Sequence, residues 1–142
     1  MNEITVIQNK IYEIRGQRVM LDFDLAALYQ VTTSALNQAV KRNMERFPDE
    51  FMFRLSEFEW NDMSSQFVTT SRTKRPKTSL PFAFTEQGVA MLSAVLRSET
   101  AIKMSISIMK AFVAMRNYIA TTTVTAELAE IRAKLALLEH LM

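Results

Sequence analysis

The sequence predicts an α+β fold: a winged helix-turn-helix-like domain with small β-hairpins, followed by C-terminal helices that end in a short coiled-coil-like helix. Short β-like runs alternate with capped helical segments in the first two thirds of the chain, and the remainder has apolar residues at helical spacing. With 142 residues, of which 49% are hydrophobic, the chain can form one domain over residues 1–120 and an amphipathic helix over 121–142.

The composition excludes most enzyme chemistry. The sequence has no cysteine and a single histidine, His140, which rules out thiolate nucleophiles, catalytic triads and multi-histidine metal sites. We therefore expect no enzyme activity, no metal and no cofactor. The N-terminus lacks a signal-peptide pattern, and no apolar stretch approaches the roughly 20 residues that span a bilayer. These features predict a cytoplasmic protein without membrane contact.

The β-like runs are short and are bounded by turn or capping residues. They lie at 11–14, 19–21, 51–55, 66–71 and 80–84. Gly16 can supply the positive φ of a tight turn between the first two runs. Ser56 and Glu59 form a capping box that begins a short helix after the third run. The last two runs flank the polar loop 72–79, which predicts a second hairpin.

Two short helices separated by a break lie between the first hairpin and the third β-like run. Asp22 has the place of an N-cap for the first helix, and Thr32 or Thr33 can cap the second, which we expect to run to about Met44. We expect Asn43 to bond backbone groups near the end of this second helix. The length and the break are typical of a helix-turn-helix.

The second helix has a polar side suited to reading DNA. On a wheel of about 100° per residue, the buried stripe contains Leu36, Ala39, Val40 and Met44. The other side contains Ser34, Asn37, Gln38, Lys41, Arg42 and Glu45. Asn37 or Gln38 can bond adenine N6 and N7, and Lys41 can donate to guanine, while Arg42 and Arg46 can reach phosphates. The alternative is an ordinary amphipathic helix whose outer side is polar because it meets water.

The net charge of +2 is distributed unevenly along the chain. Segment 32–47 is cationic, 48–63 is acidic, and the loop within 64–81 carries the cations Arg72, Lys74, Arg75 and Lys77. A cationic loop between two strands resembles the wing of a winged helix and could bind phosphates or enter the minor groove. A merely solvated loop is the alternative.

The C-terminal part is predicted to be helical. Thr85 caps a helix that runs to about Arg97, and Ser98 caps another. The latter has two apolar rows, so we expect it to be largely buried: Ile102, Ile106, Met109 and Val113, and Ile108, Phe112, Met115 and Ile119. The β-branched run 121–123 predicts a hinge.

The final helix has the apolar spacing of a coiled coil, which predicts a homodimer. Its apolar residues recur at intervals of four and three: Val124, Leu128, Ile131, Leu135, Leu138 and Met142. With Leu128 at a and Ile131 at d, the g and e positions of a parallel pair have opposite charges: Glu127 with Arg132, and Lys134 with Glu139. The alternative is a single helix folded back on the helix at 99–119.

Six segments together resemble the KilA-N DNA-binding family of phages, prophages and bacterial genomes. They are RGQRVMLD at 15–22, DLAALY at 24–29, LNQAVKRN at 36–43, RFP at 46–48, FMF at 51–53 and FAFTEQGVAML at 82–92. The similarity covers roughly residues 5–117. It implies a sequence-reading DNA-binding domain of phage type, often attached to variable C-terminal modules and associated with antirepressor-like regulation, and the segment 36–43 corresponds to the predicted reading helix.

The sequence therefore predicts a sequence-specific double-stranded DNA-binding protein, a transcriptional regulator. Its helix at 33–44 would read the major groove, and the basic loop 72–77 would contact phosphates or the minor groove. The alternative is an antirepressor-like module that captures a repressor or another regulatory protein through the C-terminal coil. A metal-dependent nuclease is not favoured, because the carboxylates after Asp49, Glu57 and Glu59, lack the accompanying lysine of such sites.

Overall fold

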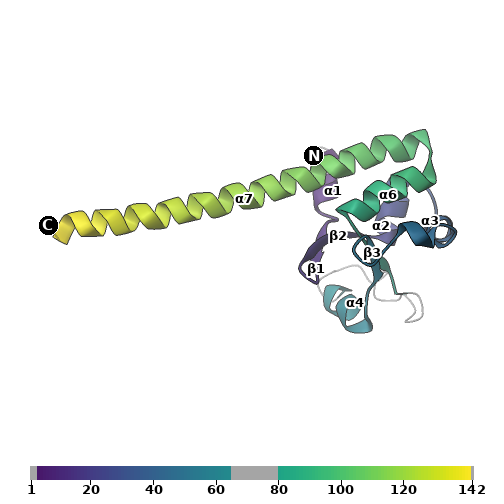
Figure 1. Ribbon diagram of the computed structural model, residues 1–142, viewed down its shortest axis with the longest axis horizontal. Coiled ribbons are helices and arrows are strands. Elements are labelled where there is room, and N and C mark those ends of the chain that lie inside the picture. The colour runs from purple at the N-terminus through teal and green to yellow at the C-terminus, as the bar shows by residue number, and fades with distance from the viewer. Residues whose placement is uncertain (1–2, 65–79, 142) are drawn as a thin grey trace.

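The computed structural model describes residues 3–64 and 80–141, with the side chains of α7 described up to 117 and over 127–139. The helices are α1 (Glu3–Gln8), α2 (Asp22–Tyr29), α3 (Thr33–Lys41), the 3-10 turn η1 (Met44–Arg46), α4 (Glu57–Ser64), α6 (Glu86–Leu96) and α7 (Glu99–Leu141). The strands are β1 (Tyr12–Ile14), β2 (Gln17–Leu21), β3 (Met52–Arg54) and β4 (Phe82–Thr85). This arrangement confirms an α+β domain followed by C-terminal helices (Figure 1).

The strands form one antiparallel sheet in the order β1-β2-β4-β3. Arg15 and Gly16 make the two-residue turn between β1 and β2, and both have positive φ, 55° and 73°, as a type I′ turn requires. β4 is central, because it pairs with β2 on one side and with β3 on the other. The strand 66–71 that the sequence predicted as its hairpin partner lies outside the described residues.

The sheet has an apolar cluster on each face. Met20, Met52 and Phe84 point to one face, where they meet the helices α1, α2, α3, α6 and α7. Val19 and Leu21 alternate with Met20 and point to the other face, where they meet Trp60 of α4. In Figure 1, α4 accordingly lies on the opposite side of the sheet from α6 and α7.

The capping predictions are confirmed in most places. The Thr32 hydroxyl accepts from Ala35 N at 3.0 Å, and Ser56 and Glu59 make both bonds of the capping box. Thr85 accepts from Gly88 N, and Ser98 from Ala101 N. The exception is Asp22, which does not cap α2: the helix begins at Asp22 itself, after Leu21.

The second helix of the predicted pair is shorter than expected. α3 ends at Lys41, and η1 follows. Asn43 donates to the Ala39 carbonyl at 2.8 Å, which confirms its predicted role at the helix end. Met44, predicted to be buried, is 49% exposed because the helix that would have turned it inward has already ended.

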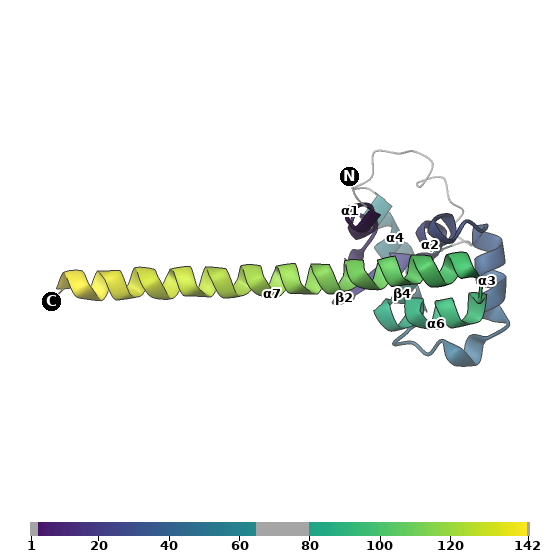
Figure 2. The ribbon, with the colours of Figure 1, turned by 90° about the horizontal axis from the view of Figure 1, so that it is seen from above.

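The last helix differs most from prediction. α7 is one continuous helix from Glu99 to Leu141, so the hinge expected at 121–123 is absent and the C-terminal part does not fold back on 99–119. It projects far beyond the rest of the domain (Figures 1 and 2). The two predicted apolar rows differ in burial: Ile108 and Phe112 of the second row are buried and Met115 is half-buried, whereas Ile102 and Ile106 of the first row are each 51% exposed. The side chain of residue 119 lies outside the described part of α7.

The first half of α7 is held to the domain by α1, α2 and α6. Tyr29 of α2 and Ser105 of α7 form a buried hydrogen bond of 2.8 Å between their hydroxyl groups. Burial raises the pKa of Tyr29 to about 12, so the phenol stays neutral. Glu86 of α6 forms an ion pair with Arg116 of α7. These bonds fix the direction in which α7 leaves the domain.

Gly88 lets α6 approach the segment before β3. A Cβ built on Gly88 would overlap the carbonyl oxygen of Phe51. The same carbonyl accepts from Thr85 N at 3.0 Å, so it cannot move away without losing that bond. The absence of a side chain at residue 88 is therefore a condition of the packing between α6 and β3.

Replacing Gly88 by alanine should lower the free energy of unfolding by about 1–3 kcal/mol, because a backbone carbonyl blocks the added methyl group. Urea denaturation measures this change. Gln87→Ala, on the exposed side of the same helix, is the matched control and should stay within about 0.5 kcal/mol of the parent chain. If the two substitutions lowered the free energy of unfolding equally, the close approach of α6 to the Phe51 carbonyl would be contradicted.

Arg15 at the hairpin turn is paired with Glu59 of α4. The guanidinium donates to both carboxylate oxygens, at 2.7 and 2.9 Å. The hydrogen bond from Arg15 lowers the pKa of Glu59 from its ordinary 4.5 to about 2, and the backbone N–H of Ser56 contributes in the same direction. The pair therefore joins the β1–β2 turn to α4, the helix that packs on the face of the sheet with Val19 and Leu21.

This pair should make stability depend on pH in the acid range. Since folding lowers the pKa of Glu59, the pair stabilises the fold above pH 4.5, and that contribution is lost as the pH falls from 4.5 to about 2. Glu59→Gln should lower the free energy of unfolding at neutral pH. The loss should be only about 1 kcal/mol, because Arg15 is half-exposed and solvent screens its charge. Unfolding curves at pH 7 and pH 2 measure it. A cost that is the same at both pH values would contradict the ion pair.

Candidate nucleic-acid interface

α3 is fixed to the domain by one side. Leu36 and Val40, the core of the predicted stripe, are 0% and 3% exposed, and the helix packs against α2 and α6. Thr32 satisfies a backbone N–H at the start of the helix. The side opposite Leu36 therefore faces outward on a rigid support.

Most of the predicted reading residues lie on this outward side. Ser34, Gln38, Lys41, Arg42 and Arg46 are exposed. Arg42 is the C-cap residue directly after α3, and Arg46 follows in η1. Within residues 3–64 and 80–141, Lys41, Arg42 and Arg46 form no ion pair. Their positive charges are available to an anionic ligand.

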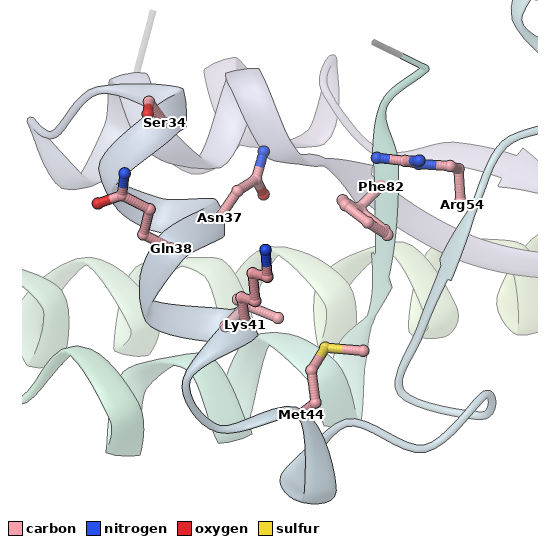
Figure 3. Close-up of a pocket in the computed structure, with 8 residues that line it drawn as sticks. Ser34, Asn37, Gln38, Lys41, Met44, Arg54 and Phe82 are labelled. Carbon is pink, nitrogen blue, oxygen red and sulfur yellow. The ribbon is translucent and has the colours of Figure 1, made fainter. Parts of the chain in front are cut away.

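Asn37 is placed differently from the prediction. It is half-buried, and its Nδ2 donates to the buried carboxylate of Asp22 at 3.1 Å. Its Oδ1 is buried and accepts no hydrogen bond from the described residues. In Figure 3 its amide points across toward Phe82, whereas Gln38 points away from it. Because Nδ2 is bonded to Asp22 and Oδ1 is buried, the Asn37 amide cannot make the paired bonds to adenine that the sequence predicted.

A hollow lies between α3 and the strands β3 and β4. It measures about 570 Å³ and is lined by Ser34, Asn37, Gln38, Val40, Lys41, Met44, Arg54 and Phe82. Figure 3 shows Lys41 and Arg54 on two sides of this space. The polar side of α3 thus continues across a hollow to the edge of the sheet.

Arg54 and Phe82 belong to this surface and were not predicted. They are partners in the β3–β4 register, and the Arg54 guanidinium lies 4.5 Å from the centre of the Phe82 ring. Such a contact holds the exposed cation in place without neutralising it. The sequence has no signal for this position, because Arg54 comes near α3 only through the pairing of β3 with β4.

Some of the predicted DNA-binding and dimerisation residues lie outside the described part of the chain. Arg72, Lys74, Arg75 and Lys77 lie outside the described residues. Of the predicted dimer residues, Leu128, Ile131, Leu135 and Leu138 are exposed, while the side chains of Val124 and Met142 are not described.

Neither a metal site nor a membrane span is found where the structure is described. In that part of the chain, no three histidine, aspartate or glutamate side chains gather as metal ligands would. No described helix has an apolar stretch long enough to cross a bilayer. The exposed side of α3 itself offers hydrogen-bonding groups and positive charge, the groups with which proteins bind polyanions.

Asn37 and its exposed neighbour Gln38 should respond differently to truncation. Asn37→Ala removes a hydrogen bond to a buried carboxylate and should lower the free energy of unfolding by about 1–2 kcal/mol. Gln38→Ala, one residue along the same helix, should change it by less than about 0.5 kcal/mol. Chemical denaturation measures both. If Asn37→Ala were as harmless as Gln38→Ala, the inward placement of Asn37 would be wrong.

Residues 9–95 match the model of the ORF6N domain family. This range includes the whole sheet, α2, α3 and nearly all of α6. No curated protein and no solved structure matches the chain significantly. The resemblance to phage-type domains is thus supported, but the matching family is ORF6N and not KilA-N. The chain belongs to the ORF6N family. The ORF6N domain is an N-terminal domain that is found in phage-type and prophage-type proteins.

Proposed function

We propose that this protein binds double-stranded DNA in a sequence-specific manner and acts in the cytoplasm as a transcriptional regulator of phage type. The observation that carries the proposal is the exposed side of α3. There Gln38 and Lys41 stand beside three arginines, Arg42, Arg46 and Arg54, that no described acidic side chain neutralises. An α-helix fits the major groove, and such a side offers both base-reading and phosphate-binding groups.

Base reading is assigned to Ser34, Gln38 and Lys41. They lie on the exposed side of α3 and line the hollow. The Gln38 amide can bond adenine N6 and N7 as a pair, and the Lys41 ammonium can donate to guanine O6 or N7. Asn37 is not assigned to base reading, because its amide Nδ2 donates a hydrogen bond to Asp22.

Phosphate binding is assigned to the cations at the margins of the hollow and beyond α3. Arg42 and Arg46 follow the end of the helix, and Arg54 extends the charge onto β3. The basic segment 72–77, which precedes β4 in the sequence, is kept as a further contact to phosphates or to the minor groove.

An antirepressor-like function is the second candidate. It is favoured by the exposed apolar residues Leu128, Ile131 and Leu135 of α7, which could meet another protein. The two functions differ in what α3 does. Capture of a repressor through α7 would not depend on Gln38 or Arg54, whereas DNA binding would.

Two substitutions in the full chain should change two different properties of DNA binding. Arg54→Ala should reduce the slope of log affinity against log salt concentration by about one unit. It should also lower the affinity for all duplexes by the same factor. Gln38→Ala should leave the slope unchanged and reduce discrimination at one base pair by about 1–3 kcal/mol. Duplexes enriched from a random pool, followed by titrations at several salt concentrations, measure both.

Lys103→Ala is the matched control for charge, because Lys103 is an exposed cation on α7 that does not line the hollow beside α3. It should alter neither the slope nor the base preference beyond a small long-range effect. If no duplex is enriched over the random pool, sequence reading is excluded. If Gln38→Ala weakens every duplex equally, Gln38 is not a base-reading residue.

A further inference from the structure

α7 has two apolar sides, and the domain covers only one of them. Ala101, Ile108 and Phe112 are buried against the domain. Ile102 and Ile106 are each 51% exposed and Val113 is 40% exposed on the other side. At about 100° of rotation per residue, the centres of the two sides are separated by roughly 120° around the helix axis. The exposed side is therefore a separate surface.

The apolar spacing of this side continues in the sequence toward the C-terminal end of α7. From Ile102 apolar residues are spaced four, three and four as far as Val113, and the same spacing of apolar residues begins again at position 124. Between 113 and 124 this spacing falls on Asn117 and on residue 120. It then includes Leu128, Ile131, Leu135 and Leu138, which are 49–58% exposed. Since a repeat of 11 residues drifts little around an α-helix, all these residues form one line on the uninterrupted α7. We call this line the α7 stripe.

The stripe has the features of a helix–helix contact. A shallow hollow of about 480 Å³ lies along it, lined by Ile106, Met109, Lys110, Val113, Ala114 and Asn117. Such a hollow accepts the knob of a neighbouring helix. Asn117 is a single exposed polar residue within the stripe, and a lone asparagine in an apolar seam favours a two-stranded coil in one register.

We propose that a second copy of this chain covers the α7 stripe from Ile102 to Leu138, as a parallel, in-register pair of α7 helices. The flanking charges favour a second copy, since Glu127 would face Arg132 of the other chain and Lys134 its Glu139, and all four are exposed. The dimer surface thus extends beyond the C-terminal segment into the domain.

The position of the exposed isoleucines determines the direction. An antiparallel pair centred on the C-terminal leucines would also match the charges, but it would leave Ile102 and Ile106 uncovered. A parallel pair places each of these residues beside its own copy across a two-fold axis. Because the domain lies to one side of the stripe, the same axis places the two domains on opposite sides of the coil.

The first test is the mass of the full chain in solution, measured by sedimentation without DNA, so that its result is independent of DNA binding. We expect a dimer. Ile106→Glu and Leu135→Glu should each raise the dimer dissociation constant by roughly tenfold or more, because each would bury a charge in the seam. Leu137→Glu and Phe58→Glu are the matched controls, since these side chains are exposed but lie off the stripe, and both should stay dimeric.

The second test uses the absence of cysteine from the sequence. Ile106→Cys and Leu135→Cys should each form a disulfide-linked dimer on mild oxidation, because a parallel pair brings equal positions together. Leu137→Cys should do so poorly. A monomeric parent chain, a dimer unaffected by Ile106→Glu, or cross-linking at residue 135 without cross-linking at 106 would each overturn the proposal. The proposal would also be overturned if the full chain were a monomer and its α7 stripe bound only a different protein.

Discussion

The buried carboxylate of Asp22 determines where α3 lies relative to the sheet. Asp22 is fully buried at the first turn of α2, where the helix N-terminus favours a negative charge. It accepts from Asn37 of α3 and from the backbone N–H of Phe82 in β4. One side chain therefore joins α2, α3 and the central strand. Because the inner side of α3 is tied in this way, its outer side, with Gln38 and Lys41, has a fixed orientation.

The proposed interface depends on the sheet as much as on the helix. Arg54 lies near α3 because β3 pairs with β4, and that pairing is continued by the bonds of Thr85 to the carbonyl groups of Glu50 and Phe51. Gly88 allows α6 to come close to the same segment. A change at residue 88 would therefore reach Arg54 through the backbone of β3, without touching any residue that is proposed to meet DNA.

The sequence predicted the local features and missed those that depend on neighbours. The Gly16 turn and the caps at Thr32 and Thr85 were predictable, because each is a bond within a few residues. The wheel correctly grouped Leu36 with Val40, but it could not show that Asp22 would draw Asn37 inward. The threonines at 121–123 each disfavour a helix by only a few tenths of a kcal/mol, and the good helix formers on both sides outweigh them.

The continuity of α7 connects the two proposals. A hinge at 121–123 would have allowed a C-terminal coil to dimerise while the two domains moved independently, and the distance between the two α3 helices would then vary. An uninterrupted α7, held to the domain by Tyr29 and by the Glu86–Arg116 pair, transmits the geometry of the coil to α3. Because helices that read two half-sites must match the helical repeat of DNA, such a dimer would accept a narrow range of half-site spacings. The rigidity of α7 would then contribute to sequence selection at positions that no side chain contacts.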